Sequence, residues 1–539
     1  MSPLPGLLII VGSLIAVQPV IDSPSTAQQA KVDRTDSPKG MGIADARHLL
    51  DRTCFGAPHQ TLENYASLTR DQAVDQLVST LETEAQTPLP EWTGLSFQEI
   101  RDLRLEDRQA FGRTQRGWQQ EARSWWAQEI LTTSSPLTER LVLMWHGHFT
   151  SEMRTVRSPH AMLAQNQLFR KNGSDNFADL LRAVSMDNAM AIYLNTQQSK
   201  KGKPNENFAR ELFELFSLGE GHYTERDVKE AARAFTGYRV QGQGQVRKVS
   251  RLHDSSVKTV LGKRGRLDGL DVVNLVLKHP ACGEWIARRF WLEFVSPTPD
   301  QDVIKKWGKV LRRSDWDLKA FLSHVFKSDQ FWSSEYRGAL VKSPVDLVMG
   351  SLRRLEISEI PGLQLNRNLQ AMGQVLFDPP NVAGWPGGTA WIDTTSLLER
   401  RKFLQDAVPT AMIFSTWQKR EGSANVGKSG MNPEKTPEMD PEMNPEMDPE
   451  MSPDMKPEMN PAGNRATRRL NRRQIRRYRP VAAQSVEKLY QQFIDGKSMN
   501  EEAWTLSWLP FQPVTDADQS DTGFGRLQEL ILDPTYQLK

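Results

Sequence analysis

The strongest constraint on the fold is the spacing of apolar residues between Ala44 and about Arg400. They recur at intervals of three and four, and few stretches alternate between apolar and polar residues as a strand would. This spacing matches the roughly 3.6 residues of a helical turn, so the sequence predicts a mainly α fold. A chain of 539 residues can bury one large core or two ordinary ones. We expect a large helical domain over residues 40–410.

One predicted helix, Leu137 to Phe149, is apolar on nearly all sides, as expected of a buried helix. It carries the best candidate metal ligands, His146 and His148, because imidazole binds zinc, iron and copper. Residues two apart on an ideal helix point about 200° apart, so both could bind one ion only if Gly147 breaks or ends the helix. Two buried histidines that bond to carbonyls or carboxylates are the alternative interpretation.

The stretch from Pro204 to Tyr238 is dense in charged residues and predicts two helices joined by a glycine turn. Phe208, Leu212 and Leu215 have the spacing of a buried stripe, and Gly219 is a plausible end of the first helix.

Thr224 and Asp227 have the spacing of a capping box at the start of the second helix.

The first of these helices offers candidate catalytic residues, Glu206, Arg210 and Glu211. Glu206 and Arg210 lie four residues apart, so they share one face of the predicted helix. Glu211 lies on the adjacent face of the same helix. Carboxylates beside an arginine suit acid/base chemistry or cation binding. A surface ladder of ion pairs explains the same spacing.

A polar loop cluster, His253-Asp254, completes the catalytic candidates. A histidine beside an aspartate can act as a base, a ligand or a turn former. The sequence shows no GxSxG, HExxH, GxGxxG or Walker loop in a convincing context, so several hydrolase and nucleotide-binding classes are not indicated.

The segment from Phe377 to Trp391 holds too many prolines and glycines for a regular helix or a central strand, so we expect a shaped loop. Its candidate binding residues are Asn381, Trp385 and Trp391. The two indoles could stack on a sugar or another flat ligand, or they could plug the loop into the core beneath it.

Composition changes over residues 422–480, where we expect a disordered insertion. Prolines recur every four residues from Pro433 to Pro461, which disfavours a helix and predicts an extended linker. Methionines between them suit Cu(I), and an expanded repeat without a ligand is the alternative. Paired arginines from Arg468 to Arg477 could contact an anionic polymer or lipid, or form a solvated tail. Residues 481–539 predict a helical segment that docks on the main domain.

The N-terminal residues predict export. Leu7 to Val17 is too short an apolar run to cross a membrane and fits a signal peptide over residues 1–27, although no Lys or Arg precedes it. No later run predicts a transmembrane anchor. We therefore expect a periplasmic, cell-surface or extracellular protein.

Charge and cysteine content exclude further classes. The 68 basic and 66 acidic residues nearly cancel, so nucleic acid is the least favoured partner, and an envelope polymer or a surface protein is preferred. Cys54 and Cys282 have neither haem c nor zinc-finger spacing. They could form a disulfide in an exported chain or remain buried thiols.

Several motifs taken in order resemble one bacterial family, the domain of unknown function 1800 family. They are Arg47-His48-Leu49-Leu50 with Arg52 and Phe55-Gly56, Trp145 to Phe149, Pro204 to Gly219, Tyr223 to Tyr238, His253-Asp254 with Lys258-Thr259, Lys342-Ser343-Pro344, and Pro379 to Trp391.

The resemblance runs from about Ala44 to Phe403 and implies a mainly helical, often exported protein without an established activity. Members often carry Asn where this chain has Gly147 and Trp where it has Tyr238, so a ligand role for position 147 does not carry over.

Two functional hypotheses follow. The first is an enzyme whose polar site gathers the histidines with the catalytic candidates, with a divalent metal as a candidate cofactor and hydrolysis of an envelope or extracellular substrate as the reaction. The second is a non-catalytic surface or export accessory protein that binds a protein or polysaccharide through the loop around Trp385 and the arginine-rich insertion.

Overall fold

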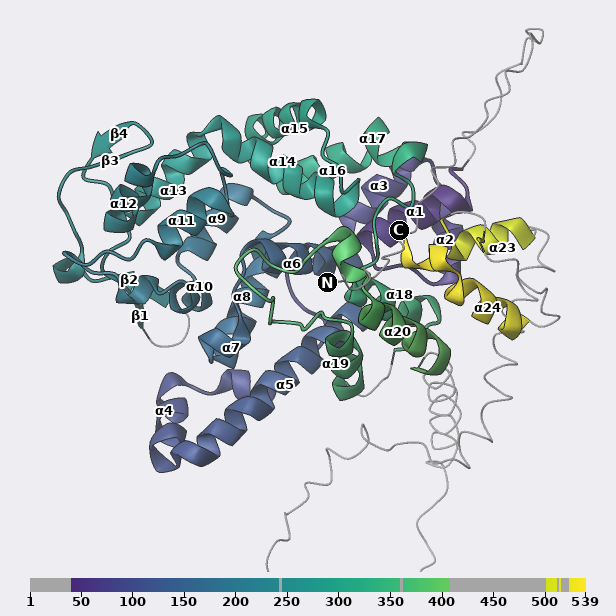
Figure 1. The fold of residues 1–539 in the computed structure, drawn as a ribbon, viewed down its shortest axis with the longest axis horizontal. Helices are drawn as coiled ribbons and strands as arrows, with labels where there is room; N and C mark the ends of the chain where they lie inside the picture. Colours follow the sequence, from purple (N-terminus) through teal and green to yellow (C-terminus); the bar gives the residue numbers. More distant parts are fainter. Residues whose placement is uncertain (1–39, 242–244, 359–361, 408–500, 511–512, 515–522) are drawn as a thin grey trace, which may run out of the picture. The chain divides into compact units, whose positions relative to one another are not determined.

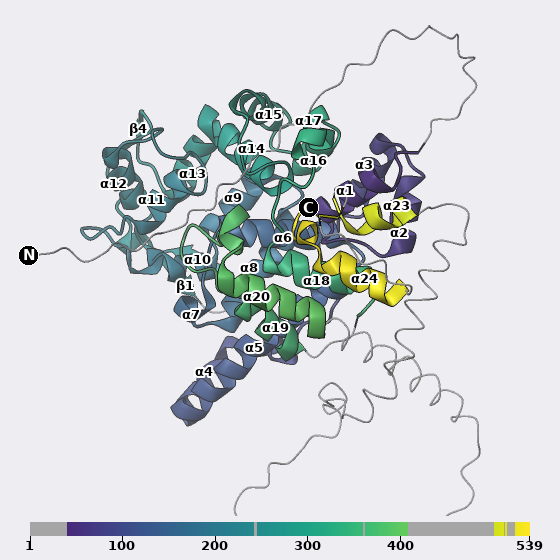
Figure 2. The ribbon, with the colours of Figure 1, turned by 45° about the vertical axis from the view of Figure 1, so that its right-hand side comes forward.

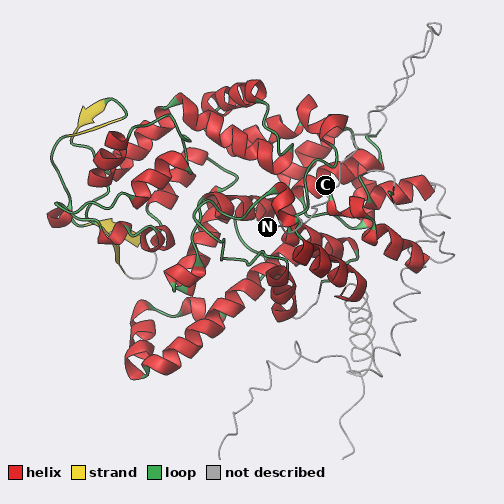
Figure 3. Ribbon diagram, in the orientation of Figure 1, coloured by secondary structure: helices red, strands yellow, loops and turns green. Residues whose placement is uncertain are grey.

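Helices dominate the part of the chain that a computed structural model describes (Figures 1 and 3). The described residues are 40–241, 245–358, 362–407, 501–510, 513–514 and 523–539. The prediction of a mainly α fold is confirmed. The predicted signal peptide and the repeat and arginine-rich segment, residues 422–480, lie outside the described residues.

The helices up to residue 234 include the buried α6 and the two helices of the charged stretch. They are α1 (Ile43–Thr53), α2 (His59–Ala66), α3 (Arg70–Ser79), α4 (Phe97–Glu106), α5 (Arg108–Thr132), α6 (Pro136–His148), α7 (Met153–Val156), α8 (Pro159–Asn172), α9 (Phe177–Ser185), α10 (Asn188–Tyr193), α11 (Asn207–Glu214) and α12 (Glu225–Ala234).

Later helices pack on these and include the two that follow the insertion. They are α13 (Gly269–Lys278), α14 (Pro280–Phe294), α15 (Gln301–Arg313), α16 (Leu318–Phe326), α17 (Asp329–Trp332), α18 (Pro344–Arg354), α19 (Gly362–Ala371), α20 (Thr394–Lys402), α23 (Glu501–Trp508) and α24 (Gly523–Leu532).

Two short antiparallel hairpins separate α12 from α13 (Figure 3). In the first, β1 (Tyr238–Gln241) pairs with β2 (Gln245–Lys248), and Tyr238 lies opposite Lys248. In the second, β3 (Lys258–Val260) pairs with β4 (Lys263–Gly265). Strands are thus a minor part of the described fold, as the scarcity of alternating runs predicts.

Helix α6 is buried along its length except at Pro136 and Gly147, which confirms the prediction for the segment from Leu137 to Phe149. It packs on α8, where Glu139 Oε1 accepts a hydrogen bond of 2.6 Å from Arg170 Nε. The indole of Trp145 donates to the carbonyl of Gly173 at 2.7 Å. Because these polar groups bond to each other, a helix with apolar faces all round can also carry charges into the core.

Helices α14 and α15 lie side by side (Figure 1). Their closest approach is between Gly283 and Gly308, where a Cβ on Gly308 would lie 2.6 Å from the backbone nitrogen of Glu284. Only glycine leaves room for two backbones at this distance. Because one face of α14 is held against α15, the rotation of α14 about its axis is fixed, and so are the directions in which its other side chains point.

The chain after the insertion contacts the main domain at several places (Figures 1 and 2). Arg354 on α18 donates to the carbonyls of Ser507 and Trp508 at 3.0 and 3.2 Å, at the end of α23. Farther on, Leu538 forms an isolated β-bridge with Val341, next to α18.

Cys54 and Cys282 are both buried free thiols, so the structure favours the second of the two interpretations of this pair. Burial raises the pKa of Cys54 to about 11, which keeps its sulfur protonated at neutral pH.

No helix in the described part of the chain combines the length and the hydrophobicity needed to cross a membrane.

Candidate functional site

Two helices present matching stripes of side chains to one groove. On α6 the stripe has the spacing i, i+3, i+4, i+7, i+8 and comprises Arg140, Leu143, Met144, Gly147 and His148. Residues at these intervals share one face of a helix.

Helix α14 contributes a stripe of the same spacing, Trp285, Arg288, Arg289, Leu292 and Glu293. Its opposite face is filled by buried residues such as Phe290, which packs on Trp145 of α6 with ring centroids 5.9 Å apart. Packing of that face fixes the polar stripe toward the groove.

The two stripes meet in antiparallel order. Arg140 Nη1 lies 3.6 Å from Glu293 Oε1, near the start of α6 and the end of α14. One turn farther along α6, the carbonyl of Met144 accepts a hydrogen bond of 3.3 Å from Arg289 Nη2. Arg289 also pairs with Glu293 at 3.2 Å. A seam of opposite charges therefore runs along the groove.

The groove has two adjoining compartments. The larger has a volume of about 480 Å³ and is lined by residues of both helices and by the loop around Trp385. The smaller has a volume of about 150 Å³ and lies toward His148 and Trp285. Gly147, Arg289, Leu292 and Ala383 line both, so they form the passage between the compartments.

The loop from Phe377 to Trp391 covers the groove. Its first turn is fixed by Asp378, which pairs with Arg123 of α5 and accepts a hydrogen bond of 3.0 Å from the backbone nitrogen of Arg154. Farther on, Gly384 has φ +90°, and a Cβ there would lie 2.1 Å from the carbonyl oxygen of Gly147. Only glycine allows this approach, which places Trp385 against the C-terminal turn of α6.

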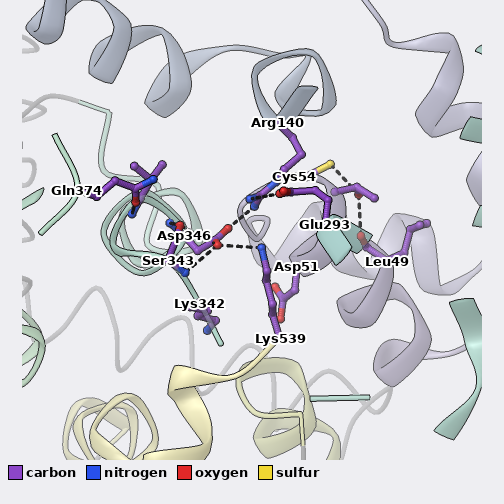
Figure 4. Close-up of polar contacts among 12 residues, drawn as sticks. Leu49, Asp51, Cys54, Arg140, Glu293, Lys342, Ser343, Asp346, Gln374 and Lys539 are labelled. Atoms are coloured by element: carbon purple, nitrogen blue, oxygen red, sulfur yellow. Dashed lines mark hydrogen bonds and ion pairs between the residues drawn. The ribbon is translucent and has the colours of Figure 1, made fainter. Parts of the chain in front are cut away.

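At the far end of the larger compartment Asp346 is the centre of an ion network (Figure 4). It pairs with Arg140, and its Oδ2 accepts hydrogen bonds of 2.8 Å from Lys539 Nζ and 2.9 Å from Ser343 Oγ. The backbone nitrogen of Ser343 donates at 2.9 Å, which closes the capping box of α18. One carboxylate thus caps a helix and balances two buried cations.

The electrostatics of this network keep Asp346 ionised. Burial by itself would raise the pKa of the carboxyl group, but Arg140 and Lys539 outweigh burial and hold that pKa well below its usual range. Since its oxygens are already bonded, Asp346 is suited to holding the network together and not to transferring protons.

Of the predicted metal ligands, His146 lies outside the groove. Its side chain is fully buried among the rings of Trp126, Phe169, Phe377 and Trp385, with centroids 5.4 to 6.0 Å away. Neither ring nitrogen has a hydrogen-bond partner among the described residues. Burial lowers the pKa of His146 to about 3, so the imidazole is neutral at physiological pH.

His148 reaches the smaller compartment, but its Nε2 is bonded to the carbonyl of Phe216 at 3.0 Å. Burial, with Arg289 nearby, lowers the pKa of His148 to about 3. Helix α6 continues through Gly147 as far as His148, so the condition for a shared ion is not met and the two imidazoles point to different surroundings. Within the described ranges, no group of three or more His, Cys, Asp or Glu residues could hold a metal ion.

The predicted catalytic residues of the charged stretch form surface ion pairs. Arg210 lies 3.4 Å from Glu206 and 2.7 Å from Glu225 at the start of α12. Glu211 is half-buried, and burial, with Glu214 nearby, raises the pKa of its carboxyl group. The capping box of Thr224 is confirmed, whereas the first helix ends at Glu214, before the turn at Gly219.

His253 and Asp254 anchor a loop. His253 Nδ1 lies 2.9 Å from the carbonyl oxygen of Thr236, and Asp254 pairs with Arg233 at 2.8 Å. The contacts of this pair and those of Arg210 have no member in common, and none of them involves His146 or His148. No hydrogen bond or ion pair among the described residues therefore joins these candidates into the single polar site that the sequence predicts.

Two of the three predicted binding residues line the groove, and the third does not. Trp385 and Trp391 both line the larger compartment, Trp385 half-buried and Trp391 almost fully buried. Asn381 is exposed and instead shapes the loop, since its Oδ1 accepts a hydrogen bond of 2.9 Å from the nitrogen of Ala383.

The stripe on α14 is what sequence reasoning missed. A tryptophan, two arginines and a glutamate at helical intervals, opposite a fully apolar face, is a pattern that could have indicated a groove. Asp346 and Lys539 carry no comparable local signal, because the two partners of Asp346, Arg140 and Lys539, are distant from it in sequence.

Comparison with known proteins identifies a family. No match to a curated protein or to a solved structure was found. The family described as "Protein of unknown function (DUF1800)" matches residues 48–538, beyond the limit at Phe403 that the resemblance suggested. Because the match covers most of the chain, this protein belongs to the DUF1800 family.

Proposed function

We propose that the groove between α6 and α14 binds a glycan. The observation that carries the proposal is the joint presence, in one cavity of about 480 Å³, of Trp385 and Trp391 with charged and hydroxyl side chains. A sugar ring has apolar C–H faces that stack on an indole and hydroxyl groups that bond to planar polar side chains, and binding sites commonly combine such walls. This develops the hypothesis of a non-catalytic polysaccharide-binding protein.

The polar groups of the cavity support a neutral or acidic sugar. Ser343 and Thr389 contribute hydroxyls, Arg289 contributes a planar group that donates hydrogen bonds, and Glu293 contributes a planar group that accepts them. Arg289 and Glu293 are already oriented by their mutual ion pair, so little conformational entropy is lost when a ligand bonds to them. The export that the sequence predicts favours an envelope or extracellular polymer as the source of the sugar.

A glycan array followed by titration of the best oligosaccharide tests this proposal. We expect micromolar to millimolar binding by the full chain and a loss of at least about tenfold in Trp385→Ala, which corresponds to roughly 1.4 kcal/mol. Trp118→Ala is the matched control, because Trp118 is also half-buried but does not line the groove. Absence of any bound glycan, or equal binding by Trp385→Ala in a folded variant, would overturn the proposal.

Hydrolysis of the bound glycan is a second candidate, favoured by Glu293. This carboxylate lines the larger compartment between Arg140 and Arg289, and as a general base it would accept a proton from the water that attacks the glycan. In that case Glu293→Gln should abolish release of reducing ends and keep oligosaccharide affinity within a few-fold. If the wild-type chain releases no reducing ends from any glycan that it binds, only the binding function stands.

A further inference from the structure

The smaller compartment of the groove differs from the larger in its charges. The described residues that line it include the cations Arg288 and Arg289 and no carboxylate. Its other polar side chains are His148 and Trp285. The larger compartment, by contrast, contains Glu293 and Asp346 beside its cations.

Arg288 is the cation without an ionic partner. Its guanidinium lies 5.5 Å from the ring centre of Trp285, and within the described residues no hydrogen bond or ion pair joins it to an acid. Glu284 precedes it by one turn of α14, yet these two side chains form no ion pair. Arg289, in contrast, is engaged by Glu293 and by the carbonyl of Met144. Arg288 is therefore free to bind an anion.

The remaining polar groups of this compartment are already engaged. Trp285 donates its indole N–H to the carbonyl of Leu215 at 2.8 Å. His148 is neutral and uses Nε2 on the carbonyl of Phe216. The guanidinium of Arg288 is thus the main group left to bind a ligand here.

The size of the compartment matches a small anionic group. A volume of about 150 Å³ corresponds to roughly five water molecules at about 30 Å³ each. A sulfate or phosphate group has five non-hydrogen atoms and a carboxylate has three, so each fits with room for water.

We infer that the compartment lined by Arg288, Arg289 and Trp285 is an anion subsite that takes a carboxylate, sulfate or phosphate substituent of the bound polymer. The inference deepens the proposed function, on which it rests, by naming acidic glycans as the ligand class. Gly147 and Ala383, which line both compartments, leave the passage through which the substituent would enter from the main groove. Arg288 sets the specificity in this arrangement, whereas Trp385 and Trp391 hold the sugar rings.

The test compares one oligosaccharide in three forms: with free uronic carboxylates, with the same carboxylates methyl-esterified, and with sulfate esters. Each is titrated into the full wild-type chain, Arg288→Gln and Arg288→Lys. Arg226→Gln is the matched control, because Arg226 is exposed on α12, outside the groove, and takes part in no ion pair within the described structure.

The wild-type chain should bind an acidic form about 10- to 100-fold more tightly than the ester, as expected of a charge-assisted hydrogen bond of roughly 1.5–3 kcal/mol. Arg288→Gln should remove most of that preference and leave affinity for the ester unchanged, Arg288→Lys should retain part of it, and Arg226→Gln should match the wild type. The ratio of the carboxylate form to the sulfate form identifies the preferred anion.

Inorganic sulfate, followed through the NMR signals of the tryptophan indoles, separates failure of the subsite from failure of the proposed function. If inorganic sulfate binds the wild-type chain but not Arg288→Gln, and no glycan binds either chain, the anion subsite stands and the proposed glycan-binding function fails. Equal affinity for acidic and esterified forms, or sulfate binding unchanged in Arg288→Gln, would overturn the subsite.

Discussion

Two ion-pair groups of similar composition occupy opposite environments in this protein. At the base of the groove, the side chains of Arg140 and Asp346 are 1% and 5% exposed. On the surface, those of Arg210 and Glu225 are 34% and 67% exposed. In the buried group every charge needs an opposite charge beside it, because an unpaired charge in the core loses its hydration without compensation. The surface group has no such requirement. The comparison shows that a dense run of charges in the sequence does not predict which charges are buried.

The largest expected effect comes from removing the central carboxylate of the buried group. Asp346→Asn keeps the side-chain volume but leaves Lys539 without its counter-ion and Arg140 with Glu293 alone, so we expect the free energy of unfolding to fall by about 3–5 kcal/mol. Denaturant titration at neutral pH measures this. The surface counterpart, Glu225→Gln, should stay close to the wild type. Equal losses of unfolding free energy in both variants would contradict the difference between the buried and the surface ion pairs.

The covering loop provides a second test of how tightly the groove is built. A Cβ in Gly384→Ala would meet the carbonyl oxygen of Gly147 at 2.1 Å, and the residue would keep a φ of +90°. We expect a loss of about 1–3 kcal/mol in stability together with weaker glycan binding. Gly387→Ala is the control, because its φ is −114° and nothing lies within 4 Å of the added Cβ. Similar melting temperatures for both variants would contradict the close approach.

The pH dependence of the unfolding free energy should report the burial of His146 on α6. The pKa of His146 is lowered from 6.5 to about 3 by burial, so between these values the unfolded chain takes up a proton that the folded chain refuses. Stability conferred by the neutral imidazole is complete above about pH 6.5 and declines as the pH falls toward 3. Its contribution to the slope is up to roughly 1.4 kcal/mol per pH unit.

His146→Phe should therefore flatten the fall of unfolding free energy between pH 6 and 4, relative to the wild type. Identical slopes in wild type and His146→Phe would show that this ring is accessible to protons in the folded chain.

The smallest effect is expected at the surface group. Arg210→Gln removes both of its ion pairs, yet solvent screens exposed charges and the free side chains regain entropy. We expect no resolvable change in the melting temperature at physiological salt, and no change in glycan affinity. A marked loss of affinity in a folded variant would return Glu206, Arg210 and Glu211 to consideration as the functional site.

Much of the fold could be predicted from local pattern. The period of apolar residues predicts the helices, the burial of α6 follows from its apolar faces, and Thr224 with Asp227 predicts a cap that the structure contains. Prolines and glycines from Phe377 to Trp391 predict a shaped loop, and two of its three candidate residues line the groove. These features depend on neighbours within a few positions, so the sequence contains all the information that they need.

The site could not be predicted in the same way, because its contacts join distant segments. Arg140 and Asp346 are 206 positions apart, and Lys539 comes from beyond the insertion. Residue type alone does not tell whether an arginine will be paired in the core, like Arg140, or left free in a cavity, like Arg288. That depends on which helix faces meet.

By itself, the sequence determined a mainly helical protein of the DUF1800 family, since helix period, caps and motif order are local properties of the chain. Only the tertiary structure decided which charged residues were buried. It separated His146 from His148, left Glu206 and Arg210 at the surface, and aligned the stripes of α6 and α14 into a groove. The physical reason is that desolvation and charge pairing depend on which surfaces pack together, and long-range packing sets those surfaces.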